Sequence, residues 1–166
     1  VLENNPKYSY CGHNYNVLRD GKIESHTINP GEYFFKDIVK RNVIHTSTLM
    51  YRRDVILNIP KEFKLLKAGD WLLQLLAFNY GPVYVMDDVM SVYRKHDMGV
   101  WSKLETKQMG QQGIDVLNMA RHFFLDKNSQ KLISASIDCR KLEYGLIKPS
   151  FFTQLMRSFK SYIYGK

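Results

Sequence analysis

The chain has 166 residues, of which 45% are hydrophobic, a size and composition that predict one globular domain and exclude a disordered chain. Lysine and arginine number 24 against 16 acidic residues, and the formal charge of +8 favours anionic partners such as phosphorylated ligands, nucleic acid or an acidic membrane surface. No apolar run reaches the roughly 18 residues that a membrane span requires. Cys11 and Cys139 lie far apart without metal-type spacing, so we expect reduced, buried thiols and a reducing compartment.

The first third of the chain predicts a hairpin, a helix and a strand. The opening "VLENNPKYS" is interpreted as the last turn of a helix that begins upstream, in a longer protein. The stretch "YSYCGHNYNVL" alternates loosely and ends at the turn signal "RDGK", which predicts a β-hairpin or a strand followed by a turn. After a Pro-Gly break, apolar residues recur at helical spacing from Phe34 to Val39. The β-branched "IHTSTLMY" predicts a buried strand, and "RRDVILNIP" predicts a short helix that stops at Pro60.

The middle of the chain predicts a strong apolar helix over residues 70–80, with Gly81 as its C-terminal cap. "PVYVM" then predicts a strand, and "VMSVYRKH" a second strand or extended segment. Asp87 and Asp88 stand between these two runs, where a pair of acids is typical of a turn. We interpret this pair as structural rather than as a metal motif.

The end of the chain is predicted to be helical. Capping and periodicity favour helices over 102–125 and 128–146, and a last amphipathic helix over 150–164. We therefore expect an α/β fold over 1–104 and a helical C-terminal extension over 105–166.

The order of features in residues 42–102 carries a resemblance. "NVIHTSTLMYRRDVI", "IPKEF" and "KAGDWLLQLLAFNYGPVYVMDDVMSVYRKHDMGVWS" follow one another. This order resembles the second half of a family 2 glycosyltransferase, in which a strand ending in Arg-Arg precedes a helix opening with an acid, commonly Glu-Asp, and a Tyr-Arg-x-His segment follows. The resemblance covers residues 1–102. It implies an incomplete GT-A-like mixed sheet and the acceptor-side half of an inverting enzyme, which moves a sugar from a nucleotide-sugar donor to a glycan acceptor in bacterial polysaccharide biosynthesis.

The chain departs from the family pattern in three ways. Gly69 stands where many members have Glu, "NIPKEF" replaces a frequent Gly-Gly-Phe loop, and the nucleotide-binding βαβ units and metal-binding Asp-x-Asp are missing. The resemblance therefore implies a C-terminal fragment that is inactive alone and needs no cofactor alone, whereas the full-length enzyme uses a divalent ion, Mn or Mg. It implies a cytoplasmic protein, at or near the inner face of the membrane.

Asp70 allows two interpretations. An Asp before an apolar helix is typical of an N-terminal cap. By resemblance, the same carboxylate is the general base that takes the proton of the acceptor hydroxyl. Both hold at once if one oxygen caps the helix while the other faces a cleft.

Four further residues are candidates by resemblance. Arg94 and His96 lie in the segment that folds over the donor diphosphate, and a guanidinium suits phosphate because its planar fork binds two oxygens. His96 is also a tentative metal ligand. Ser47 is a weak substrate-binding candidate, and Trp101, beside a glycine, is the better candidate for stacking on a sugar. Trp71, inside the apolar helix, is expected in the core.

An alternative from another class is a basic, non-enzymatic module that binds an acidic membrane surface or nucleic acid through the tail. No RNA- or DNA-binding signature supports the nucleic-acid version, so we expect no nucleic-acid partner. Peripheral membrane contact through residues 150–166 and self-association through an unprotected sheet edge are the other expected interactions. The remaining histidines show no mutual ligand spacing.

Overall fold

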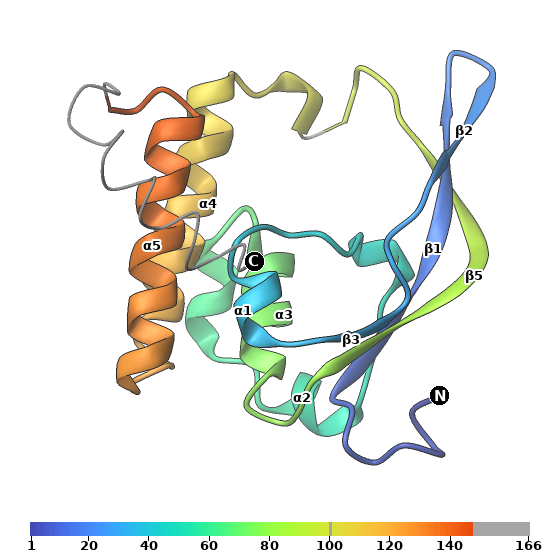
Figure 1. The fold of residues 1–166 in the computed structure, drawn as a ribbon. Coiled ribbons are helices and arrows are strands. Elements are labelled where there is room, and N and C mark those ends of the chain that lie inside the picture. Colours follow the sequence, from blue (N-terminus) through green and yellow to red (C-terminus); the bar gives the residue numbers. More distant parts are fainter. Residues whose placement is uncertain (100, 148–166) are drawn as a thin grey trace, which may run out of the picture.

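The structure is a computed structural model that describes residues 1–99 and 101–147. Over these residues, five strands form one sheet in the order β2-β1-β5-β3, with β4 paired to β1 off this path. β1 and β5 are parallel and the other pairs are antiparallel, so the predicted mixed α/β class is confirmed. Figure 1 shows β1, β2 and β5 curling away on one side, while α4 and α5 stand on the other.

The bounds of the strands are β1 Tyr10–Arg19, β2 Lys22–His26, β3 Gly31–Tyr33, β4 Met50–Tyr51 and β5 Val83–Arg94. The α-helices are α1 Phe35–Ile38, α2 Arg53–Leu57, α3 Gly69–Ala77, α4 Thr106–Ala120 and α5 Lys127–Glu143. Three short 3-10 helices are η1 Thr46–Thr48, η2 Lys61–Leu65 and η3 Trp101–Lys103.

The β1–β2 hairpin is confirmed, and local turn chemistry explains it. Arg19 pairs with Lys22, which leaves the two-residue turn Asp20–Gly21. Their φ angles are 50° and 74°. Two residues with positive φ are typical of the type I′ turn, whose twist matches that of the flanking strands.

The predicted turn at Asp87 and Asp88 is wrong, because both residues lie inside the continuous strand β5. His13 pairs with Met86 and the next residue, Asn14, pairs with Val89, so the two acids oppose no residue of β1. They form a bulge, which lets an exposed polar pair sit in a strand without ending it. The interpretation of the pair as structural rather than metal-binding agrees with this position.

The predicted strand over residues 44–51 is also wrong. Thr46–Thr48 is a 3-10 helix, and only Met50–Tyr51 pairs as a strand. His45 caps the turn because its side chain accepts the Ser47 amide, and Thr48 Oγ1 donates to the His45 carbonyl at 2.7 Å. These local side-chain bonds compete with strand pairing and outweigh the β-branched composition.

The N-terminal residues are two successive turns rather than the predicted end of a helix. The guanidinium of Arg52 holds them, donating to the carbonyls of Leu2 at 2.6 Å, Asn5 at 3.1 Å and Tyr8 at 2.7 Å. Arg52, the first residue of the Arg-Arg pair, therefore binds the first residues of the chain.

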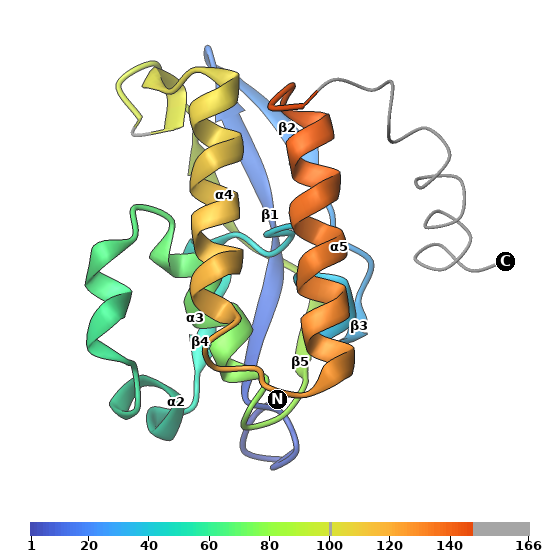
Figure 2. The ribbon, with the colours of Figure 1, turned by 90° about the vertical axis from the view of Figure 1, so that its left-hand side faces the viewer.

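The predicted helices in the second half are present. α4 and α5 run side by side across the molecule (Figure 2), and their apolar faces share one core with α1, α3 and the sheet. The buried residues that these two helices contribute to that core are Ile114, Val116, Leu117, Ala120, Ile133 and Ile137. No helix within the described residues is long and apolar enough to cross a bilayer. The predicted helix over 150–164 and its membrane contact lie outside the described residues.

We predict that Gly81→Ala destabilises the protein more than Gly31→Ala. Both glycines have φ values that other residues rarely adopt, 140° and 130°, so both variants carry backbone strain. A Cβ at Gly31 meets open space, whereas one at Gly81 meets the backbone carbonyl of Lys7. Overpacking of this kind costs about 1–3 kcal/mol, and urea unfolding of the two variants measures the difference. Equal urea midpoints for the two variants would show that the backbone at Lys7 moves away from the new Cβ at little cost.

Candidate active site

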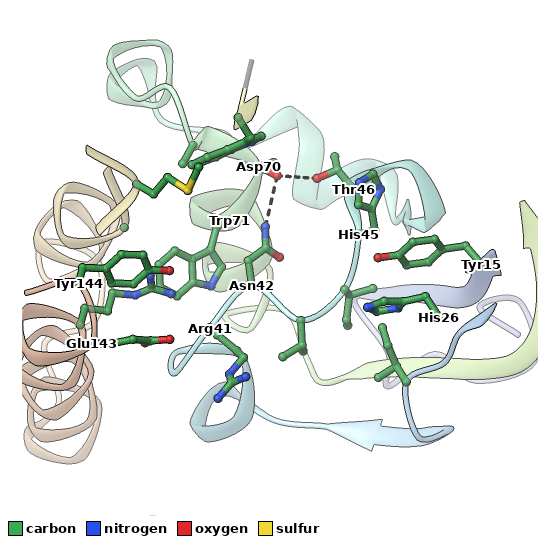
Figure 3. A pocket seen from close by; sticks show the side chains of 18 of the residues that line it. Tyr15, His26, Arg41, Asn42, His45, Thr46, Asp70, Trp71, Glu143 and Tyr144 are labelled. Carbon is green, nitrogen blue, oxygen red and sulfur yellow. Dashed lines mark hydrogen bonds between the residues drawn. The ribbon is translucent and has the colours of Figure 1, made fainter. Parts of the chain in front are cut away.

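A cleft of about 670 Å³ opens between the curled sheet, the start of α3, and α4 with α5. Its volume lies within the range of small-molecule sites. Figure 3 shows Tyr15 and His26 on one side, Glu143 and Tyr144 on the other, and Asn42, Thr46 and Asp70 between them. The lining of the cleft also includes Arg41, His45, Trp71, Trp101, Gly113 and Arg140.

Asp70 is not the cap of α3, so that interpretation is wrong. The helix begins at Gly69, its N-cap residue is Ala68, and no side chain caps it. The half-buried carboxylate instead accepts two hydrogen bonds on Oδ2, from Thr46 Oγ1 at 2.6 Å and Asn42 Nδ2 at 3.3 Å. Over the described residues, no hydrogen bond reaches Oδ1. The carboxylate is thus oriented through one oxygen, and the other is left for a ligand.

The residues that hold Asp70 are themselves held by α3. Gln74 Nε2 donates to Asn42 Oδ1 at 2.7 Å and to the Ile44 carbonyl at 3.1 Å. The Trp71 indole N–H donates to the Ile38 carbonyl at 2.9 Å. Segment 38–46 is therefore tied to the helix that carries Asp70, and the site does not depend on an unsupported loop.

The sheet side of the cleft is aromatic. Tyr15 stacks on His26 with ring centroids 4.6 Å apart, and His45 lies 4.2 Å from Tyr93. His45 Nδ1 lies 2.8 Å from Ser47 Oγ. Burial lowers the pKa of His45; Asp70 raises it to a smaller extent and His26 lowers it. His45 is thus favoured in its neutral form.

The helix side holds a buried arginine that sequence reasoning missed. Arg140 is 8% exposed, and its guanidinium lies 4.3 Å from the Trp71 ring and 5.8 Å from the Tyr144 ring. Gly113 makes room for it, since a Cβ there would lie 2.6 Å from an Arg140 terminal nitrogen. The available signal was spacing: Arg140 follows Ile133 and Ile137 on the apolar face of the predicted helix.

The structure brings some predicted site residues together and separates others. Asp70 and Trp101 line the same cleft, and Trp101 is 43% exposed. Ser47 does not line this cleft but contacts His45, which does. Arg94 and His96 line a second cleft of about 520 Å³ near the Asp20–Gly21 turn.

The tentative metal role of His96 lacks companion ligands in the described part of the chain. Among residues 1–99 and 101–147, no group of three or more His, Cys, Asp or Glu side chains could hold a metal ion. The described residues therefore do not by themselves form a divalent-ion site.

Searches of protein-family models, curated proteins and solved structures returned no match to this chain. The cleft combines an oriented carboxylate, an exposed tryptophan and a buried guanidinium around a ligand-sized space.

We predict that lowering the pH destabilises the parent protein more than it destabilises the His45→Phe variant. The folded-state pKa of His45 lies below its ordinary value of 6.5. The unfolded chain therefore takes up the proton first, so the stability contribution of neutral His45 is present above that value and lost as the pH falls through the folded-state pKa. Protonated Nδ1 also loses its capacity to accept the Ser47 amide.

The melting temperatures at pH 7.5 and pH 5 measure this effect. His45→Phe, which keeps an aromatic ring beside Tyr93, should show the smaller fall between the two pH values. Ser47→Ala is the matched control: it leaves His45 in place and should keep the parent's pH dependence. The same fall in the parent and in His45→Phe would contradict the assignment.

Proposed function

We propose that this chain is the acceptor-side half of an inverting glycosyltransferase, with Asp70 as its general base. The carrying observation is the Asp70 carboxylate, which is fixed by Thr46 and Asn42 in a cleft instead of capping its helix. The exposed indole of Trp101 on the same cleft supports the proposal, because an aromatic face suits the apolar face of a sugar ring. The order of motifs in residues 42–102 supplies the reaction class.

The proposed chemistry uses one proton transfer and one displacement. The acceptor hydroxyl lies at Asp70 Oδ1, and its oxygen attacks the anomeric carbon of the donor sugar. The bond from that carbon to the nucleoside diphosphate breaks, the diphosphate leaves with the electron pair, and Asp70 takes the hydroxyl proton. Thr46 and Asn42 keep the carboxylate in place through Oδ2, so Oδ1 needs no rearrangement to act.

The donor in this proposal is bound mainly by residues outside the 166. The resemblance assigns the nucleotide pocket and the metal acids to segments that this sequence does not contain. Arg94 and His96 remain candidates for the diphosphate. Both side chains are exposed, and they line the second cleft with Arg19 and Lys95. Asp20 and Asp97 line it too, so its arginines and lysine outnumber its acids by one.

We predict that Asp70→Asn lowers sugar transfer by about 10²–10⁴-fold, the effect typical of a lost general base. The assay needs a protein that joins these 166 residues to the segment encoded upstream. Asn keeps an acceptor oxygen for Thr46 and Asn42, so the free energy of unfolding should change by less than about 1 kcal/mol.

Asp54→Asn is the matched control for this experiment. Asp54 is the second residue of α2, as Asp70 is of α3, but it does not line the cleft. It therefore loses the same interaction with a helix N-terminus without touching the site. If both variants turn over within a few-fold of the parent, the Asp70 carboxylate only tethers segment 42–46 and the catalytic assignment is wrong.

We also predict that the 166-residue chain alone neither transfers nor hydrolyses nucleotide sugars and does not bind a nucleoside diphosphate tightly, because the proposed pocket lies elsewhere. Isothermal calorimetry with UDP and GDP tests this, with the protein joined to its upstream segment as the positive control. Micromolar binding to the chain alone would contradict the proposed division of the enzyme.

A further inference from the structure

Arg140 is a buried cation that lacks the usual compensation. Arg140 is 8% exposed, and its Nε is buried without a hydrogen-bond partner among residues 1–99 and 101–147. Within the described residues, no carboxylate lies within the 4.0 Å of an ion pair with it. Buried charges in proteins are normally paired, because desolvation of a charge is costly.

The rings around Arg140 compensate it only in part. Trp71 and Tyr144 offer their rings at 4.3 and 5.8 Å, which favours a cation but leaves the buried Nε–H without an acceptor. Burial lowers the pKa of the guanidinium despite the nearby Tyr144 and Glu143. The described protein thus holds a cation at a cleft wall, and at least one of its N–H donors, Nε, is unpaired among the described residues.

Two more charges flank this position. Arg41 lines the same cleft, is exposed, and acts on Arg140 as a like charge. Glu143 lies three residues after Arg140 on α5 and is also exposed at the cleft. Figure 3 shows Arg41 and Glu143 on the same side of the cleft, away from Asp70. Two guanidinium groups against the one carboxylate of Glu143 leave this side of the cleft with net positive charge, which favours a ligand that brings negative charge.

We propose that the cleft binds its ligand through an oxyanion, a carboxylate or a phosphate group, placed against Arg140 and Arg41. Resting on the function proposed above, this inference names the substrate class: a glycan acceptor that carries an acidic or phosphorylated sugar. The guanidinium fork suits either oxyanion, because it donates two parallel hydrogen bonds. Glu143 is the competing charge, which the ligand displaces from the neighbourhood of Arg140.

The three probes for the experiment are inorganic phosphate, glucuronate and glucose, each titrated into the ¹⁵N-labelled 166-residue chain and followed by NMR. We expect phosphate or glucuronate to bind in the millimolar range, with shifts around residues 41–46 and 140–144, and glucose to bind at least about 10-fold more weakly. If a probe binds through its charge, its affinity should also fall as the salt concentration is raised from 50 to 300 mM.

Variants separate this site from general attraction to a basic protein. Arg41→Gln should lower the affinity for the oxyanion about 10-fold, and Glu143→Gln should raise this affinity. Arg53→Gln is the matched control, since it removes one exposed positive charge on α2, outside the cleft, and should leave affinity within two-fold. Arg140→Met should abolish binding of the oxyanion, and Arg140→Lys should retain part of it. Arg41 and Glu143 are exposed, so we expect their variants to fold and to test the proposal even if the Arg140 variants do not fold.

Binding of glucuronate alone indicates an acidic sugar, and binding of phosphate alone indicates a phosphorylated one; both support the proposal. Equal weakening by Arg41→Gln and Arg53→Gln, or glucose binding as tightly as the anions, overturns it. Asp70→Asn should keep oxyanion binding, so loss of this site and loss of the proposed catalytic role are separate results.

Discussion

The rotation of α3 about its axis is the constraint on which the rest of the structure depends. Trp71 and Gln74 face the same neighbour, and each donates to a backbone carbonyl of segment 38–44. A buried donor left without its acceptor costs about 1–3 kcal/mol, so this setting is strongly preferred. Once it is fixed, Asp70, one residue before Trp71, must project from the core edge toward Thr46 and Asn42. Core packing and site geometry are therefore one arrangement.

The same indole also positions the far wall of the cleft. One edge of Trp71 bonds α1 through Ile38, while a ring face receives the Arg140 guanidinium from α5. Gly113 on α4 is the complementary feature, because any side chain there would displace that guanidinium. Four helices, α1, α3, α4 and α5, thus contribute residues around the stacked pair of Trp71 and Arg140. Helices α4 and α5 are in this sense part of the site rather than an appendage to it.

Local chemistry made part of this fold predictable. The hairpin at Asp20–Gly21 and the apolar helix from Gly69 to Ala77 need only neighbouring residues, and sequence reasoning found both. The strand predicted around Thr46 was wrong because the cap that His45 provides outweighs strand propensity. The cap predicted at Asp70 was wrong because its carboxylate accepts a hydrogen bond from Asn42, a residue distant in sequence. Resemblance to a family pointed to Asp70 and Trp101. It gave no hint of Arg140, whose burial depends on a tryptophan far away along the chain.

The two departures from the pattern of the proposed family, at Gly69 and in "NIPKEF", lie next to each other in the structure. Gly69 stands where Glu is common, and "NIPKEF" replaces the Gly-Gly-Phe loop. The structure places them in contact: a Cβ at Gly69 would lie 3.0 to 3.3 Å from three atoms of the Phe63 ring. Phe63 is half-buried and packs against the core, so a side chain at 69 requires its ring to shift by a few tenths of an ångström. The ring of η2 therefore occupies the space a larger side chain at 69 requires, and the start of α3, with Asp70 behind it, is set by that packing.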